Sequence, residues 1–174
     1  MILWDGRWSF MRNPFDDLHS EIMSRMRRLA AAVPDSVELG FHLCYGDWEA
    51  KHFIDPEDAG KMVELANALF VGVSRPITYF HMPVPMERSD DDYFQPLRNL
   101  ALAPGTELFL GLVHGDGVEG TRKRIAAAAK YAPEFGIATE CGIARSRTPA
   151  TVRTLLQIHA DASAEPPLPV AASL

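Results

Sequence analysis

Short apolar runs and longer amphipathic segments alternate along most of the chain. The apolar runs predict strands at residues 2–4, 37–45, 76–82, 107–114 and 135–139. Between them, apolar residues recur three or four positions apart, which is the spacing of one helix face, as at Leu18, Ile22, Met26 and Leu29. We therefore predict helices at residues 16–33, 55–69, 89–100, 120–131 and 149–159.

The regular alternation of strands and helices predicts the fold class. Near-continuous apolar strands separated by helices are typical of a parallel sheet covered by helices, so we expect an α/β fold with about five parallel strands and flanking helices. We assign residues 1–160 to this single domain. Residues 161–174 are rich in alanine, proline and serine, and we expect them to form a disordered tail.

Composition and charge narrow the class of partner. The chain has 174 residues, a net charge of -6 and no dominant basic stripe, so we do not expect it to bind nucleic acid. No apolar run approaches the ~20 residues of a membrane span, so we expect no membrane partner. Asp5 and Arg7 stand where a signal peptide needs apolar residues, so we expect a cytoplasmic protein whose two cysteines are reduced.

Chemically capable side chains gather where the predicted strands end. Parallel strands place their functional groups at the carboxyl ends, both in open α/β sheets and in β/α barrels. The sequence has no glycine-rich phosphate loop of the GxGxxG or GxxxxGK[ST] type, which favours the barrel over a nucleotide-binding fold. The residues at the strand ends are Asp5, His42, Cys44, His81, His114, Glu140 and Cys141.

His42 and Cys44 are the strongest candidates for metal binding. Residues i and i+2 of a strand point to the same face, so the imidazole and the thiol project together. An imidazole and a thiolate suit a soft divalent ion, and zinc is the first expectation. The alternative is that Cys44 is a small buried apolar residue and His42 a hydrogen-bonded core histidine.

Several ordered segments resemble the catalytic barrel of cobalamin-independent methionine synthases and their shorter relatives. The segment from Phe41 to Asp47 resembles the His-x-Cys strand of that family, and the segment from Thr139 to Gly142 resembles its late Cys-Gly motif. Trp4-Asp5, the segment from His81 to Pro85 and the segment from Glu119 to Arg122 extend the resemblance over nearly the whole chain. The resemblance implies a (β/α)8 barrel of the kind shared with uroporphyrinogen decarboxylase. It also implies zinc bound by His42, Cys44 and Cys141, and methyl transfer to a thiol.

The chain departs from the family pattern in two ways. The family has a glutamate ligand on the strand after His-x-Cys, whereas the corresponding strand here lacks a carboxylate and ends at His81. Either His81 is the fourth ligand, or the site has three protein ligands plus water or substrate. In addition, the chain accounts for about five of the eight barrel strands, beginning at the Asp5 strand. We therefore expect it to pair with a second copy or with a complementary N-terminal barrel half.

Two further residues receive expected roles. An aspartate at the position of Asp5 contacts the amino acid in the family, so Asp5 is expected to bind a substrate ammonium, with a helix cap or turn as the alternative. His114 precedes a Gly-Asp-Gly turn and is the candidate general acid. The expected function is zinc-dependent methyl or alkyl transfer from a methyl donor to a small-molecule thiol. The alternative is a non-catalytic metal-binding or regulatory barrel fragment.

Overall fold

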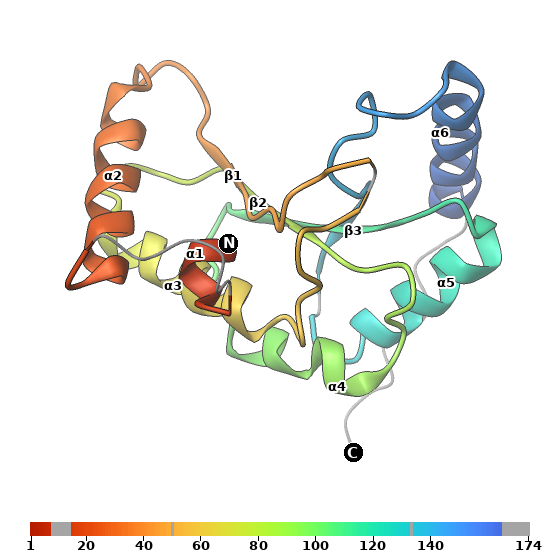
Figure 1. Cartoon of the computed structure of the whole chain (residues 1–174), viewed down its shortest axis with the longest axis horizontal. Helices are drawn as coiled ribbons and strands as arrows, with labels where there is room; N and C mark the ends of the chain where they lie inside the picture. Colours follow the sequence, from red (N-terminus) through yellow and green to blue (C-terminus); the bar gives the residue numbers. More distant parts are fainter. Residues whose placement is uncertain (8–14, 50, 133, 165–174) are drawn as a thin grey trace.

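A four-stranded parallel sheet in the order β1-β2-β3-β4 forms the centre of the molecule (Figure 1). The computed structural model describes residues 1–7, 15–49, 51–132 and 134–164. The strands are β1 (Gly40–His42), β2 (Tyr79–Pro83), β3 (Glu107–Val113) and β4 (Gly136–Thr139). The helices are α1 (Ile2–Asp5), α2 (Leu18–Ala32), α3 (Gly60–Gly72), α4 (Asp91–Phe94), the 3-10 helix η1 (Gln95–Asn99), α5 (Gly117–Ala128) and α6 (Pro149–Ser163).

The predicted α/β class and parallel sheet are confirmed, but the prediction of about five strands is wrong for the part of the chain that the structure describes. Residues 2–4 form the first turn of a helix instead of a strand. Three apolar residues fit either period, and tertiary contacts decide between them. The Trp4 ring stacks on His19 of α2 at 4.0 Å, and Gly6 ends the helix with a φ of 78°. The edges of the sheet are therefore β1 and β4.

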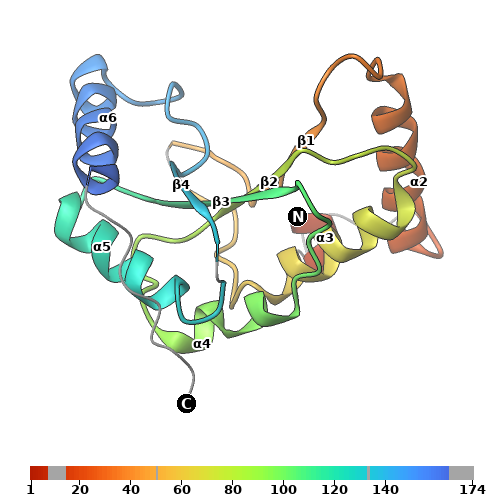
Figure 2. The ribbon, with the colours of Figure 1, turned by 180° about the vertical axis from the view of Figure 1, so that it is seen from behind.

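The helices lie on one face of the sheet and along its sides. In Figure 1, α3, α4 and α5 lie below the sheet, and α2 and α6 stand on either side of it. Figure 2 shows the same arrangement from behind, with β4 in view. Strand alternation explains this cover, because Phe80 and Met82 of β2 point toward the helices and are fully buried. Asp17 and Thr148 cap α2 and α6 through the backbone N–H groups of Ser20 and Thr151.

The opposite face of the sheet is more open and is lined by aromatic rings beside glycines. The strand register places Tyr79 next to Gly40 and Phe109 next to Gly136. A Cβ atom on Gly40 would lie 2.2 Å from the Tyr79 ring, so the ring covers the neighbouring strand. Tyr79 remains 39% exposed. This face is therefore less completely covered than the face that carries Phe80 and Met82.

The end of the chain is helical further than predicted. α6 continues to Ser163, so residues 161–163 belong to the helix and not to the expected tail. The remainder of the predicted tail, residues 165–174, lies outside the described residues. Among the residues that the structure covers, none of the helices combines the length and apolar character needed to cross a membrane.

Candidate metal centre

The carboxyl ends of the two edge strands, β1 and β4, converge on one point. Cys44 follows β1 and Cys141 follows β4, and their sulfur atoms are 3.2 Å apart although 97 positions separate them in the sequence. The N–H group of Leu43 donates to the carbonyl of His81 at 2.9 Å, which continues the pairing of β1 with β2 up to the residue before Cys44. The two thiols that meet here therefore come from the two opposite edges of the sheet.

His42 completes a group of three donors. One ligand atom from each of His42, Cys44 and Cys141 lies within 4.8 Å of the others. Ligand sulfurs bound to one tetrahedral zinc at about 2.3 Å are ~3.8 Å apart, so the thiol pair needs only a small opening to accept an ion. Two thiols and an imidazole are donors suited to a soft divalent metal. The residues present therefore fit a metal ion, as the i, i+2 spacing of His42 and Cys44 predicted.

The two thiols have unequal acidities. Burial alone would raise the pKa of Cys44, but hydrogen bonds with His42, Cys141 and the Gly46 N–H outweigh burial and lower it. Burial raises the pKa of Cys141 to about 12, with further contributions from the hydrogen bond to Cys44 and the negative charges of Cys44 and Asp47. Cys44 therefore becomes the thiolate first, and Cys141 holds the shared proton until a metal ion displaces it.

His81, the predicted fourth ligand, lies beside His42 and outside the three-donor group. The Nδ1 atoms of the two histidines are 2.8 Å apart, and the rings stack with centroids 4.7 Å apart. Burial, followed by the charge of His42, lowers the pKa of His81 to about 4, so His81 is neutral at pH 7. In this arrangement His81 orients the imidazole of His42 through a hydrogen bond.

His114 is buried next to Glu140, close to the cysteine pair. Its Nε2 is 2.8 Å from the carbonyl oxygen of Val84, and because a carbonyl only accepts, Nε2 carries the hydrogen. Its Nδ1 faces Glu140 Oε2 at 3.7 Å. Burial lowers the pKa of His114, and the charge of Glu140 partly opposes this effect. A small cavity of about 90 Å³ adjoins His114 and Glu140.

His52 is a buried residue that the sequence did not reveal. Its side chain is only 5% exposed. Its two ring nitrogens each lie 3.1 Å from a carboxylate oxygen, one of Asp55 and one of Glu140. Burial opposes the charged imidazolium, but the two carboxylates outweigh burial and raise the pKa of His52. A histidine in a loop has no periodicity, so no sequence signal identified this contact.

Asp5 already has protein partners in the position where a substrate ammonium was expected. It ends α1, not a strand, and its side chain is 3% exposed. Arg7 Nη2 donates to its Oδ2 at 3.0 Å, and the Tyr45 hydroxyl donates to the same oxygen at 2.9 Å. The hydrogen bond from Arg7 is the main cause that lowers the pKa of Asp5. An ammonium group would therefore have to compete with Arg7 for this carboxylate.

Comparisons with family models, with curated proteins and with solved structures find no match to the chain. The resemblance to cobalamin-independent methionine synthases therefore rests on the sequence motifs described above.

Proposed function

We propose that the chain binds one zinc ion through His42, Cys44 and Cys141 and transfers a methyl or alkyl group to a small-molecule thiol. The observation that carries the proposal is the convergence of these three donors within 4.8 Å at the carboxyl end of the sheet. The proposed architecture is part of a (β/α)8 barrel. In this proposal the four parallel strands correspond to four consecutive strands of the barrel, and the helices to its outer layer. The motifs shared with cobalamin-independent methionine synthases support the choice of reaction.

Zinc, when bound, makes a ligated thiol more acidic while the sulfur remains nucleophilic. The residues of this chain would orient the metal ligands and supply the thiolate. His81 holds the imidazole of His42, and the lowered pKa of Cys44 makes it the first of the two cysteines to ionise. The substrate thiolate attacks the methyl carbon of the donor, a carbon–sulfur bond forms, and the leaving group departs with the electron pair of its former bond to carbon.

His114 is the proposed general acid for that leaving group. Its Nε2 hydrogen is held by Val84, and burial lowers the pKa of His114, so Nδ1, which faces Glu140, must first take up the proton that it would transfer. The charge of Glu140, which also pairs with His52, raises the pKa of His114 and so favours a proton at this position. Asp5 remains the proposed ammonium site, and Tyr45, which directly follows Cys44, connects it to the metal centre.

One observation favours a second candidate function. Both oxygens of Asp5 already accept hydrogen bonds from Arg7, and Tyr45 binds one of them as well. A substrate site whose carboxylate is neutralised in this way binds an amino acid weakly. A metal-binding or regulatory protein without turnover explains the same metal centre and needs no free Asp5.

A measurement of both metal and turnover distinguishes the two functions. The purified chain is assayed for zinc and then incubated with a small aminothiol and a methyl donor, with Cys141→Ser protein as the matched control. Methylated thiol formed by the wild type alone supports the transferase. One zinc per chain without methylated thiol supports the non-catalytic function, and an absence of zinc rejects both.

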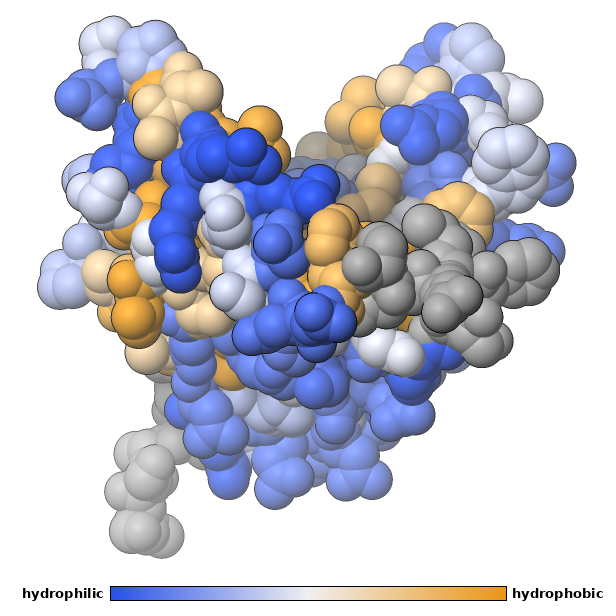
Figure 3. Space-filling view, turned by 60° about the vertical axis from the view of Figure 1, so that its left-hand side comes forward, coloured by the Kyte–Doolittle hydropathy of each residue, from blue (hydrophilic) through white to orange (hydrophobic). Residues whose placement is uncertain are grey.

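We also propose that the open face and edges of the sheet are covered by a second copy of the chain or by a complementary N-terminal barrel half. β1 and β4 each pair on one side only within the described residues, and Tyr79 is 39% exposed on the open face. Hydrophilic residues predominate on the side seen in Figure 3, which is hollowed between two projecting parts. Light scattering at micromolar concentration tests this proposal, and a monodisperse monomer with full zinc occupancy would contradict it.

A further inference from the structure

Two charged side chains connect the cysteine-bearing segments across the metal centre. Asp47 follows Cys44 by three positions, and Arg147 follows Cys141 by six. Arg147 Nη1 lies 4.0 Å from Asp47 Oδ2, and the side chains are only 13% and 4% exposed. The pair is therefore an ion pair largely withdrawn from solvent, where its charges are weakly screened.

Arg147 holds the turn that carries Cys141. Its Nη1 donates to the carbonyl of Gly142 at 2.6 Å, and the carbonyls of Cys141 and Arg145 lie 3.5 Å from the same atom. The Gly142 carbonyl also accepts from the Arg145 N–H at 2.8 Å, which closes the turn, and the guanidinium placed among the three carbonyls fixes their relative directions. Arg147 therefore determines how the turn presents the sulfur of Cys141.

Asp47 is packed against the same turn. A Cβ atom on residue 142 would lie 1.4 Å from Asp47 Oδ2, so the carboxylate occupies space that only a glycine leaves free. Gly142 also has a φ of 72°, a conformation that glycine adopts without strain. Asp47 Oδ2 is buried and has no hydrogen-bond partner among the described residues, so its main interaction is with the charge of Arg147.

The sheet itself does not fix the distance between the two cysteines. β2 and β3 lie between β1 and β4, so no backbone ladder joins the strands from which Cys44 and Cys141 emerge. Side chains must therefore set the separation of the sulfur atoms. The ion pair of His52 with Glu140 joins the same two regions on the other side of Cys141.

We propose that Asp47 and Arg147 are positioning residues that tie the segment after β1 to the turn after β4 and so hold Cys44 and Cys141 at metal-binding distance. The proposal rests on the proposed metal centre for its consequence, but the positioning itself is a property of the metal-free chain. Because His52 and Glu140 provide a second tie, loss of the pair loosens the site without abolishing it.

The test uses the full chain with Asp47→Asn, Arg147→Met and Arg147→Lys, and with the charge-conserving Arg145→Lys as the matched control. Arg145 lies on the same turn and carries the same charge, but it is exposed and its guanidinium holds no carbonyl of the turn. Circular dichroism of each metal-free variant establishes that it is folded. Arg147→Lys keeps the charge and loses the planar guanidinium, so it reports on geometry if Arg147→Met does not fold.

The first readout needs no metal. Diamide oxidises the two thiols to a disulfide. The thiols lose two protons and two electrons, and diamide accepts them and becomes the corresponding hydrazine. In the metal-free wild type and in Arg145→Lys, we expect rapid formation of the intramolecular disulfide between Cys44 and Cys141. In Asp47→Asn and both Arg147 variants, we expect it to be several-fold slower. Removal of the negative charge of Asp47 would by itself make Cys141 more acidic and faster to react, so slower oxidation of Asp47→Asn identifies a loss of positioning.

The second readout is zinc affinity, measured by competition with a chromophoric chelator. Loss of groups that orient metal ligands typically weakens binding by roughly 10- to 100-fold. We expect this loss in Asp47→Asn and in both Arg147 variants, with one ion per chain still bound at saturating zinc. Oxidation rates equal to wild type in all folded variants would overturn the positioning proposal. A wild type that oxidises as expected but binds no zinc would overturn the proposed function alone.

Discussion

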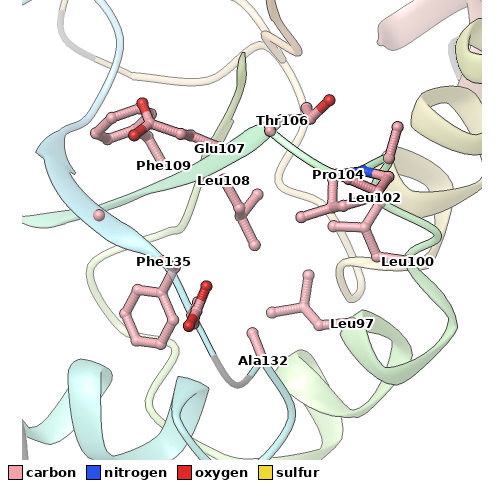
Figure 4. Close-up of a pocket in the computed structure, with 14 residues that line it drawn as sticks. Leu97, Leu100, Leu102, Pro104, Thr106, Glu107, Leu108, Phe109, Ala132 and Phe135 are labelled. Carbon is pink, nitrogen blue, oxygen red and sulfur yellow. The ribbon is translucent and has the colours of Figure 1, made fainter. Parts of the chain in front are cut away.

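The two ends of the sheet contrast sharply in the side chains that they gather. At the carboxyl end, two thiols, four imidazoles and several buried charges meet in little open space, and the cavity beside His114 is only about 90 Å³. At the amino end, η1 and the beginnings of β3 and β4 surround a much larger hollow of about 710 Å³ (Figure 4). Its lining is mainly apolar and includes Leu97, Leu100, Leu102, Leu108 and Phe135.

The connections between the strands explain this contrast. The connection from β2 to β3 contains only the four-residue α4 and the five-residue η1, so it covers the start of β3 incompletely and leaves leucines around a hollow. The segment between β1 and α3 is shorter but less regular, and it carries Cys44, Asp47 and His52 to the far edge of the sheet. The larger hollow and the convergence of metal-binding donors therefore lie at opposite ends of the sheet.

The largest expected effect tests the amino end. Leu108 is 3% exposed and lies in the core beside the hollow. Leu108→Ala should lower the free energy of unfolding by roughly 2–5 kcal/mol, because it removes buried methyl groups and enlarges an existing hollow. Urea denaturation measures this loss. The folded variant should bind as much zinc as the wild type, and a reduced zinc content would show that the two ends are not independent.

The next effect arises from His81 at the carboxyl end. Its folded-state pKa of about 4 lies below the ordinary value of 6.5, so the unfolded chain binds the extra proton first. The stability of the metal-free protein should therefore fall as the pH is lowered from 6.5 to 4, by about 3 kcal/mol from this group. Chemical denaturation at several pH values measures the slope. His81→Gln should flatten it, and an identical slope in the variant would contradict a neutral, buried His81.

The smallest effect concerns the thiols in the absence of metal. Cys141 is half-buried and its thiol contacts chiefly Cys44, so Cys141→Ser should change the stability of the metal-free protein by less than about 1 kcal/mol. Thermal unfolding in the presence of a chelator measures this. A much larger loss of stability would mean that the cysteine pair is part of the structural core. The contrast drawn above between the carboxyl end and the amino end of the sheet would then be wrong.

Local periodicity was sufficient to predict part of the site. The common direction of His42 and Cys44 follows from strand alternation, which depends on the backbone alone. The approach of Cys141 to this pair required knowledge of how the edges of the sheet curve, and the family resemblance supplied it. The sequence also placed β3 within one residue of its observed bounds, because its apolar run is bounded on both sides by turn residues that mark where the strand begins and ends.

Other features depended on contacts between distant segments and were not predictable in the same way. Residues 2–4 are too few to distinguish a strand from a helix, and the stacking of Trp4 on His19 decides the outcome. The contact of His81 with His42 depends on the register of β1 with β2, which brings the two imidazoles into a hydrogen bond. The burial of His52 depends on Glu140, which is 88 positions later in the sequence.

The central claim is that His42, Cys44 and Cys141 bind one metal ion between the edges of the sheet, and cobalt(II) titration of the full chain tests it most directly. A metal bound by two thiolates gives an intense charge-transfer absorption whose strength follows the number of sulfur ligands. The wild type and the imidazole control His159→Gln should each saturate at one cobalt per chain and release it to zinc. Cys44→Ser and Cys141→Ser should each lose most of this absorption and much of the affinity, and His42→Gln should keep the thiolate band with weaker binding. Equal cobalt binding by the wild type and both serine variants, or no thiolate absorption in the wild type, would contradict the claim.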